Sequence, residues 1–186
     1  MLMYEFSLKT TGITVGTLLI CVHAIALFRR SDAIWWLRKF PRSRSWGIAL
    51  LLIAALWTFL LVMKMDLGEF ANLRIVILWS IAGATVLSWY FLEDFLAVRS
   101  TGIVAILAAK PILSACFLRS ANYRFALVIL AYIWILLGLT WVGMPYLMRD
   151  QIAWLVASPW RWNIAVGTGI LVGLSILSCS LFPQVV

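Results

Sequence analysis

Long apolar runs alternate with short polar segments along most of this chain. Five uninterrupted runs are each long enough to cross the hydrocarbon core of a bilayer as a helix: 10–28, 46–63, 75–92, 125–144 and 164–181. A sixth run, 101–118, is interrupted by polar residues. The pattern predicts an all-α integral membrane protein, a polytopic helical bundle of five to six transmembrane helices with interfacial helices, in a single domain over residues 1–186.

The run 101–118 has three open geometries because Lys110 and Pro111 lie near its middle. A lysine at the bilayer centre costs roughly 2.5–3.5 kcal/mol on insertion scales. Proline removes a backbone donor and disturbs the helix. The run therefore either crosses as a kinked helix, dips and returns as two half-helices buried in protein, or lies along the interface.

The segment 29–45 is strongly basic and aromatic. Six basic residues surround Trp35 and Trp36: Arg29, Arg30, Arg38, Lys39, Arg42 and Arg44. This pattern predicts a short interfacial helix, ended by Pro41, whose basic side binds anionic lipid. The positive-inside rule then makes the segment cytoplasmic and the N-terminus external, in a bacterial inner membrane. The segment 144–162 is too interrupted to span and is expected at an interface.

Composition supports lipid as the solvent of this chain. Hydrophobic residues make up 65% of the sequence and charged residues 12%, about half the share usual in soluble domains. The net charge of +8 does not indicate nucleic-acid binding, because six of the 15 Lys and Arg residues lie in one loop between apolar runs. Cys21, Cys116 and Cys179 have neither CxxC nor Cys/His spacing, so no metal site is predicted.

Small residues recur at helical spacing in three of the runs. Gly12 and Gly16 form one GxxxG pair, Gly169 and Gly173 form another, and Ser80, Gly83, Ala84 and Ser88 make a small-residue stripe. Such faces let helices approach closely. They predict packing within the chain, or contact with a membrane-protein partner or a second copy through the two GxxxG faces.

His23 is the single histidine of the chain. Its position in an apolar run suggests either a haem or quinone ligand, or a side chain hydrogen-bonded to a neighbouring helix. A bis-histidine haem needs a second histidine, which the sequence lacks. No cofactor is therefore expected.

The polar residues in and around the run 101–118 form the other candidate site. Lys110 is expected to be shielded from lipid, either by donating to the Leu107 carbonyl that Pro111 leaves without a donor or by pairing with Glu93 or Asp94. Glu93 and Asp94 can alternatively pair with Arg99, or remain solvated charges at a helix end.

Three functions remain open. The sequence has no catalytic motif, and no segment outside the apolar runs exceeds about 20 residues. No catalytic residue is predicted. The favoured hypothesis is an accessory or scaffold subunit of a larger membrane assembly. The alternatives are a small-solute or anion transporter with its site at Lys110 and Pro111, and a membrane enzyme or quinone- or haem-associated protein using His23 and Lys110.

Overall fold

The computed structural model describes residues 7–91, 95–119 and 123–182, which are almost entirely helical and contain no strand. The elements in chain order are α1 (Leu8–Phe28), α2 (Arg30–Lys39), the 3-10 helix η1 (Phe40–Arg42), α3 (Arg44–Lys64), the 3-10 helix η2 (Gly68–Leu73), α4 (Arg74–Phe91), α5 (Leu96–Cys116), α6 (Arg124–Gly143), α7 (Tyr146–Val156) and α8 (Pro159–Leu181). Six of these helices are long and apolar enough to cross a membrane. The predicted all-α membrane fold is confirmed.

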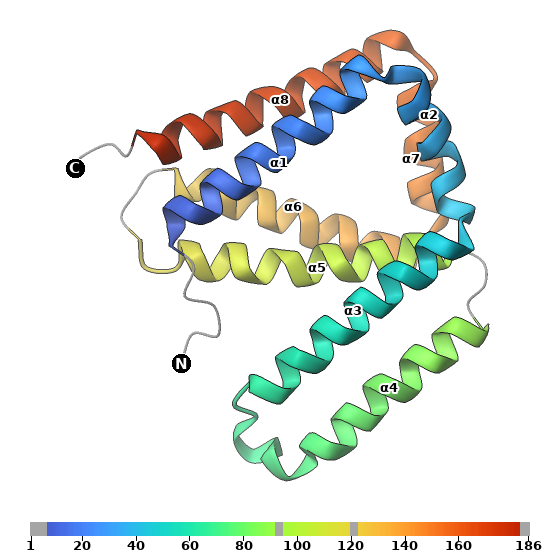
Figure 1. The fold of residues 1–186 in the computed structure, drawn as a ribbon, viewed down its shortest axis with the longest axis vertical. Helices are drawn as coiled ribbons and strands as arrows, with labels where there is room; N and C mark the ends of the chain where they lie inside the picture. Colours follow the sequence, from blue (N-terminus) through green and yellow to red (C-terminus); the bar gives the residue numbers. More distant parts are fainter. Residues whose placement is uncertain (1–6, 92–94, 120–122, 183–186) are drawn as a thin grey trace.

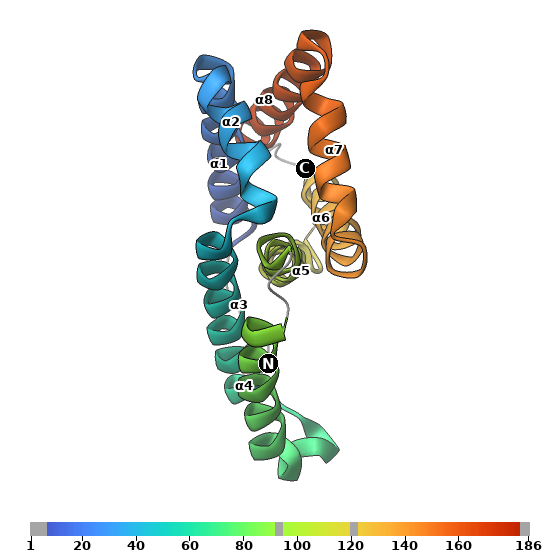
Figure 2. The same ribbon diagram turned by 90° about the vertical axis from the view of Figure 1, so that its right-hand side faces the viewer.

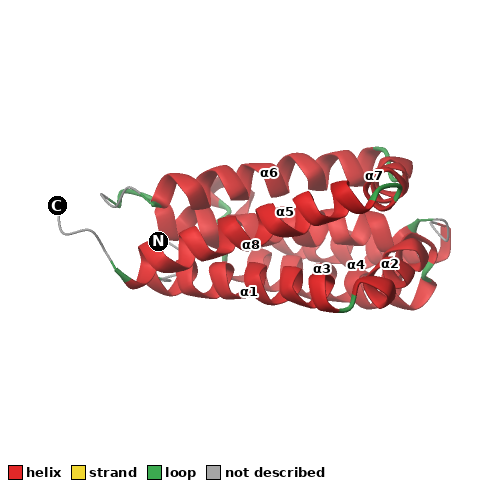
Figure 3. Cartoon of the chain, turned by 90° about the horizontal axis from the view of Figure 1, so that it is seen from above, coloured by secondary structure: helices red, strands yellow, loops and turns green. Residues whose placement is uncertain are grey.

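The six long helices form three antiparallel pairs: α1 with α8, α5 with α6, and α3 with α4 (Figure 1). The α1–α8 and α3–α4 pairs are inclined to the α5–α6 pair (Figure 1), and α2 and α7 lie together at one end of the long helices (Figure 3). The start of α1 and the ends of α3, α5 and α8 lie at the opposite end (Figure 1). Because successive long helices alternate in direction, the short elements that connect them lie at two opposite ends of the molecule (Figure 1): α2, η1 and α7 at one end and η2 at the other.

The α1–α8 pair is held together by the two predicted GxxxG motifs, which face each other. A Cβ atom added at Gly16 would lie 3.0 Å from the Gly173 carbonyl oxygen, and one at Gly169 would overlap the His23 ring. These glycines permit backbone contact between the two helices. The expected intermolecular contact through these faces would therefore require α1 and α8 to separate.

The other close approaches use glycines outside any sequence motif. A Cβ at Gly102 of α5 would lie 2.6 Å from the Gly138 carbonyl oxygen of α6, and the reverse distance is also 2.6 Å. A Cβ at Gly47 of α3 would lie 2.9 Å from the Ala97 backbone nitrogen of α5. Contacts this short leave no room for a side chain, so α5 packs directly on α6 and α3.

Residues 101–116 of the run 101–118 belong to one continuous helix, α5. Phe95, with a left-handed φ of 59°, precedes α5, which extends from Leu96 through Lys110 and Pro111 to Cys116. The re-entrant alternative with two half-helices is therefore wrong. The alternative along the interface does not fit either, because α5 lies antiparallel to α6 with its length along the other long helices (Figures 1 and 3).

Candidate functional site

Helix α5 connects the rest of the molecule. It packs most extensively on α6, then on α3, and also contacts η1 and α1. In Figure 2 it lies between the α3–α4 pair on one side and α6 and α7 on the other. Lys110, Arg99 and Pro111 all belong to this helix, so the structure tests whether they act together.

Lys110 is half-buried and makes no hydrogen bond or ion pair within the described ranges. The expected bond to the Leu107 carbonyl is absent there. Arg99 is eleven residues earlier on the continuous helix, which places it about 16 Å away along the axis. Glu93 and Asp94 lie outside the described residues. Of the predicted site residues that the structure describes, none forms a hydrogen bond or ion pair with Lys110.

The buried polar atoms of α5 lie near its start. Ser100 is fully buried and its hydroxyl has no partner among the described residues. The Nε atom of the neighbouring Arg99 is also buried without a partner there. Both residues lie one turn beyond Ala97, where α3 crosses α5 at Gly47. Unpaired polar groups on α5 therefore gather at the end occupied by α2 and α7, about 16 Å from Lys110.

Pro111 lines a groove between four helices, the Pro111 groove. Its walls come from α1, α3, α5 and α6: Thr10, Thr11, Thr14, Val15, Leu18, Trp57, Ala108, Pro111, Ile112 and Trp134. Lys110 is not among them. A helix turns about 100° per residue, so Lys110 lies roughly 160° around α5 from both Ala108 and Ile112. Lys110 and Pro111, expected to form one site, face different directions.

This geometry removes the basis of the transporter hypothesis. That hypothesis uses half-helix ends freed by Pro111 beside a lysine in a polar cavity. Here α5 is continuous, and the Pro111 groove is almost entirely apolar. No observation in the described ranges favours solute transport.

His23 is a packing residue between α1 and α8. Its Nδ1 lies 2.8 Å from the Leu19 carbonyl oxygen one turn earlier on the same helix. Its ring covers Gly169 of α8. The expected hydrogen bond to a neighbouring helix is therefore replaced by a bond within α1. No group of three or more His, Cys, Asp or Glu side chains suited to a metal occurs in the described part of the chain.

The second candidate site is the surface formed by α2 and α7, the basic–aromatic surface. As predicted for 29–45, α2 is a short helix that ends just before Pro41. The Lys39 Nζ lies 3.9 Å from the centre of the Trp35 ring, and the Arg161 guanidinium carbon lies 4.6 Å from the Trp154 ring. These stacked pairs hold positive charge on an aromatic layer, as suits a membrane interface.

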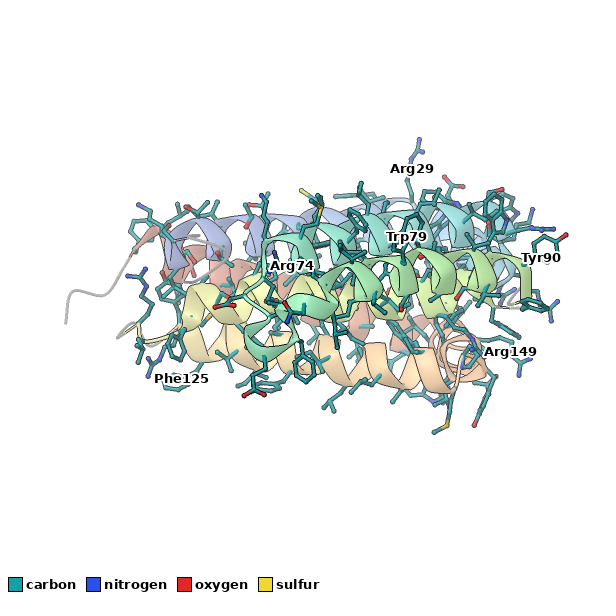
Figure 4. The ribbon with its side chains drawn as sticks, turned by 90° about the horizontal axis from the view of Figure 1, so that it is seen from below. Arg29, Arg74, Trp79, Tyr90, Phe125 and Arg149 are labelled. Carbon is teal, nitrogen blue, oxygen red and sulfur yellow. The ribbon has the colours of Figure 1, made fainter. Side chains whose placement is uncertain are left out.

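Charge on this surface is only partly neutralised. Arg29 pairs with Asp32 at 3.9 Å and Arg149 with Asp150 at 3.0 Å. Both arginines are exposed and point away from the helices (Figure 4). Nine of the 15 basic residues belong to this end of the molecule: Arg29, Arg30, Arg38, Lys39, Arg42, Arg44, Arg99, Arg149 and Arg161. The surface can therefore attract anions such as lipid phosphates.

Tyr123, which precedes α6 at the opposite end, is a contact that the sequence did not reveal. Its ring lies 3.6 Å from the Cβ position of Gly12 on α1. The pKa of its phenol is raised by burial first, and then by the thiols of Cys116 and Cys179. Tyr123 also packs against the cluster that contains Cys116 at the end of α5, and Ser180 of α8 lies near the same Gly12 position.

No protein-family model, curated protein or solved structure matches this chain.

Proposed function

We propose that this protein is an accessory or scaffold subunit of a larger membrane assembly, and that α4 is the helix that contacts its partner. One observation carries the proposal: α4 has no buried residue, whereas each of the other five long helices has several. The α3–α4 hairpin extends away from the remaining helices, and α4 is attached through α3 (Figures 1 and 2).

The exposure of the apolar side chains of α4 does not by itself predict a partner protein, because apolar side chains are well solvated by lipid. Gly83 adds a second observation. No atom lies within 4 Å of a Cβ added at Gly83, so the backbone of α4 is open there to the close approach of another helix. Gly167 of α8 is equally open, so what distinguishes Gly83 is its place on the one long helix without a buried residue.

The predicted small-residue stripe on α4 divides between two faces. Ala84 and Ser88 face the rest of the chain, where they line a groove with residues of α3 and with Ile103 of α5. Gly83 faces away, between Trp79 and Tyr90, which are 74% and 79% exposed. In Figure 4, Trp79 is drawn over the ribbon of α4 and Tyr90 at the end of that helix. A small position flanked by large aromatic ones offers a notch for a partner helix.

The orientation is part of the same proposal. Nine basic residues lie at the α2–α7 end and five at the other: Lys9, Lys64, Arg74, Arg119 and Arg124. By the positive-inside rule the α2–α7 end is cytoplasmic and the N-terminus external, in a bacterial inner membrane. The basic–aromatic surface would then rest on the anionic lipids of the cytoplasmic leaflet.

Photo-crosslinking from α4 in native membranes tests the scaffold proposal. A photoreactive phenylalanine analogue at Trp79 or Tyr90 is expected to give one discrete protein adduct. The same analogue at Leu171, 68% exposed on α8, is expected to give only lipid adducts. An adduct of twice the chain mass identifies a second copy as the partner, and another discrete mass identifies a different subunit.

Gly83→Leu is the matched test of the notch. It is expected to abolish the adduct from Trp79 without lowering the stability of the isolated protein, because no atom of the described chain meets the new side chain. Gly167→Leu, at an equally open position on α8, should leave the adduct intact. Identical crosslinking patterns from Trp79, Tyr90 and Leu171 would contradict the proposal.

A further inference from the structure

The Pro111 groove is a cavity of about 340 Å³, whose α1 wall comes from the first half of that helix. Its size lies at the lower end of the range for small-ligand sites. It is open on one side, and its walls expose far more apolar than polar surface. A ligand for this groove must therefore be narrow and mostly apolar.

The polar atoms of the groove have a definite arrangement. The Thr14 hydroxyl donates to the carbonyl oxygens of Thr10 and Thr11, each at 3.0 Å, and the Thr10 hydroxyl lies 2.8 Å from that of Ser7. The Thr11 hydroxyl has no hydrogen-bond partner among the described residues, although Thr11 is only 8% exposed. Thr11 therefore presents one unused donor to the groove.

The α5 wall that faces Thr11 is apolar and consists of Ala108, Pro111 and Ile112. The side chains that can offer polar atoms to the groove are therefore few: Thr10, Thr11, Thr14, Trp57 and Trp134. These are too few for a hydrated solute but enough to orient a lipid.

The depth of these groups matches the polarity of a lipid chain. Helix α1 has 21 residues and is about 31 Å long, close to the thickness of the hydrocarbon core. Thr11 is the fourth residue of α1, so it lies about 5 Å inside the helix end. Leu18 is about 10 Å deeper. The groove is therefore polar near the headgroup boundary and apolar toward the bilayer centre.

We propose that the Pro111 groove holds one acyl chain of a membrane phospholipid, with the Thr11 hydroxyl donating to the ester carbonyl of that chain. The chain extends along Val15 and Leu18 toward Trp57 and Trp134. The lipid fills the space between the α1–α8 pair and the α5–α6 pair and thereby holds them at a fixed separation. The occupant is recognised by its chain and ester, so the identity of its headgroup is secondary.

Native mass spectrometry of the protein released from nanodiscs of palmitoyl-oleoyl phosphatidylglycerol tests this proposal. The wild type is expected to retain one phospholipid per chain under conditions that remove the surrounding lipids. Thr11→Val removes one hydrogen bond and should lower retention by about two- to tenfold. Ala108→Phe fills the groove and should abolish retention.

Two matched controls separate groove binding from general effects. Thr17→Val on α1 is the control for Thr11→Val, and Ala49→Phe on α3 is the control for Ala108→Phe. Both control residues are exposed and lie outside the groove. Both control variants should retain the lipid as the wild type does. Thr11→Val is nearly isosteric, so it keeps the test decisive if Ala108→Phe fails to fold.

Three results would overturn the proposal. The wild type could retain no lipid, or Thr11→Val could retain as much as Thr17→Val. Solvent extraction of protein purified from native membranes could also release an isoprenoid quinone in place of a phospholipid.

Discussion

Gly138→Ala is expected to destabilise the protein by about 1–3 kcal/mol, the usual penalty for adding a methyl group to a filled contact. The added Cβ would lie 2.6 Å from the Gly102 carbonyl oxygen and 2.7 Å from the Ile106 Cγ1 atom. The carbonyl is part of the backbone and cannot rotate aside, so α5 and α6 must separate. Gly102→Ala should have a similar effect because its Cβ would meet the Gly138 carbonyl at the same distance.

The free energy of unfolding can be measured by titrating SDS into mixed micelles and following tryptophan fluorescence. Gly167→Ala is the control, because no atom lies within 4 Å of a Cβ at that position on α8. It should be neutral or slightly stabilising, since alanine favours the helix. Equal stabilities of the Gly138 and Gly167 variants would show that α5 and α6 do not pack as described.

Lys110→Met is expected to stabilise the protein by roughly 1–3 kcal/mol, a value below the full cost of a lysine at the bilayer centre. The ammonium group has no hydrogen bond or ion pair within the described ranges. Lys110 is six residues, or about 9 Å, from the end of α5 at Cys116, so its side chain must extend far to reach the interface. Methionine has similar length and no charge to solvate.

Lys64→Met is the matched control for this change, because Lys64 is the exposed last residue of α3 and its ammonium can remain in water. It should change the SDS unfolding free energy by a few tenths of a kcal/mol at most. A Lys110→Met variant that loses stability, or that folds but loses a measurable biological activity, would indicate a polar partner for Lys110. That outcome would favour the transport hypothesis over the scaffold proposal.

Much of the fold could be predicted because the membrane simplifies the physics. A spanning helix needs about 20 apolar residues, so each expected span coincides with a helix within a few residues at either end. The short helix α2 was equally predictable, because basic and aromatic residues mix only where lipid meets water. Both inferences depend on local sequence alone.

The course of residues 101–118 could not be decided from local sequence. Lys110 and Pro111 oppose insertion, and their cost nearly cancels the gain from the apolar residues around them. Packing between helices decides the course of these residues, because α5 lies against α6 at Gly102 and against α3 near Ala97. Those contacts depend on residues distant in sequence, and neither Gly102 nor Gly138 belongs to a recognisable motif.

The candidate site was predicted less well for the same reason. Lys110 and Pro111 were expected to form one site because they are neighbours in the sequence. Adjacent residues on a helix, however, point about 100° apart. Thr11 was not predicted as a site residue, because a threonine in an apolar helix usually forms a hydrogen bond with the backbone of its own helix, as Thr14 does. Only the structure shows that Thr11 faces the Pro111 groove without such a bond in the described part of the chain.

The most direct test of this account is the side of the membrane on which α2 and α7 lie. Our proposal that α5 crosses the bilayer requires Ser31 on α2 and Gln151 on α7 to share one side, and Ser7 to lie on the other. Single cysteines at these exposed positions, in a variant without the native cysteines, can be treated with a membrane-impermeant thiol reagent in intact cells.

We expect labelling at Ser7 and protection at both Ser31 and Gln151 until the membrane is permeabilised. Labelling at both Ser31 and Gln151 would reverse the proposed orientation but keep the six-span fold. Labelling at only one of them would mean that α5 does not cross the membrane, and would contradict the account.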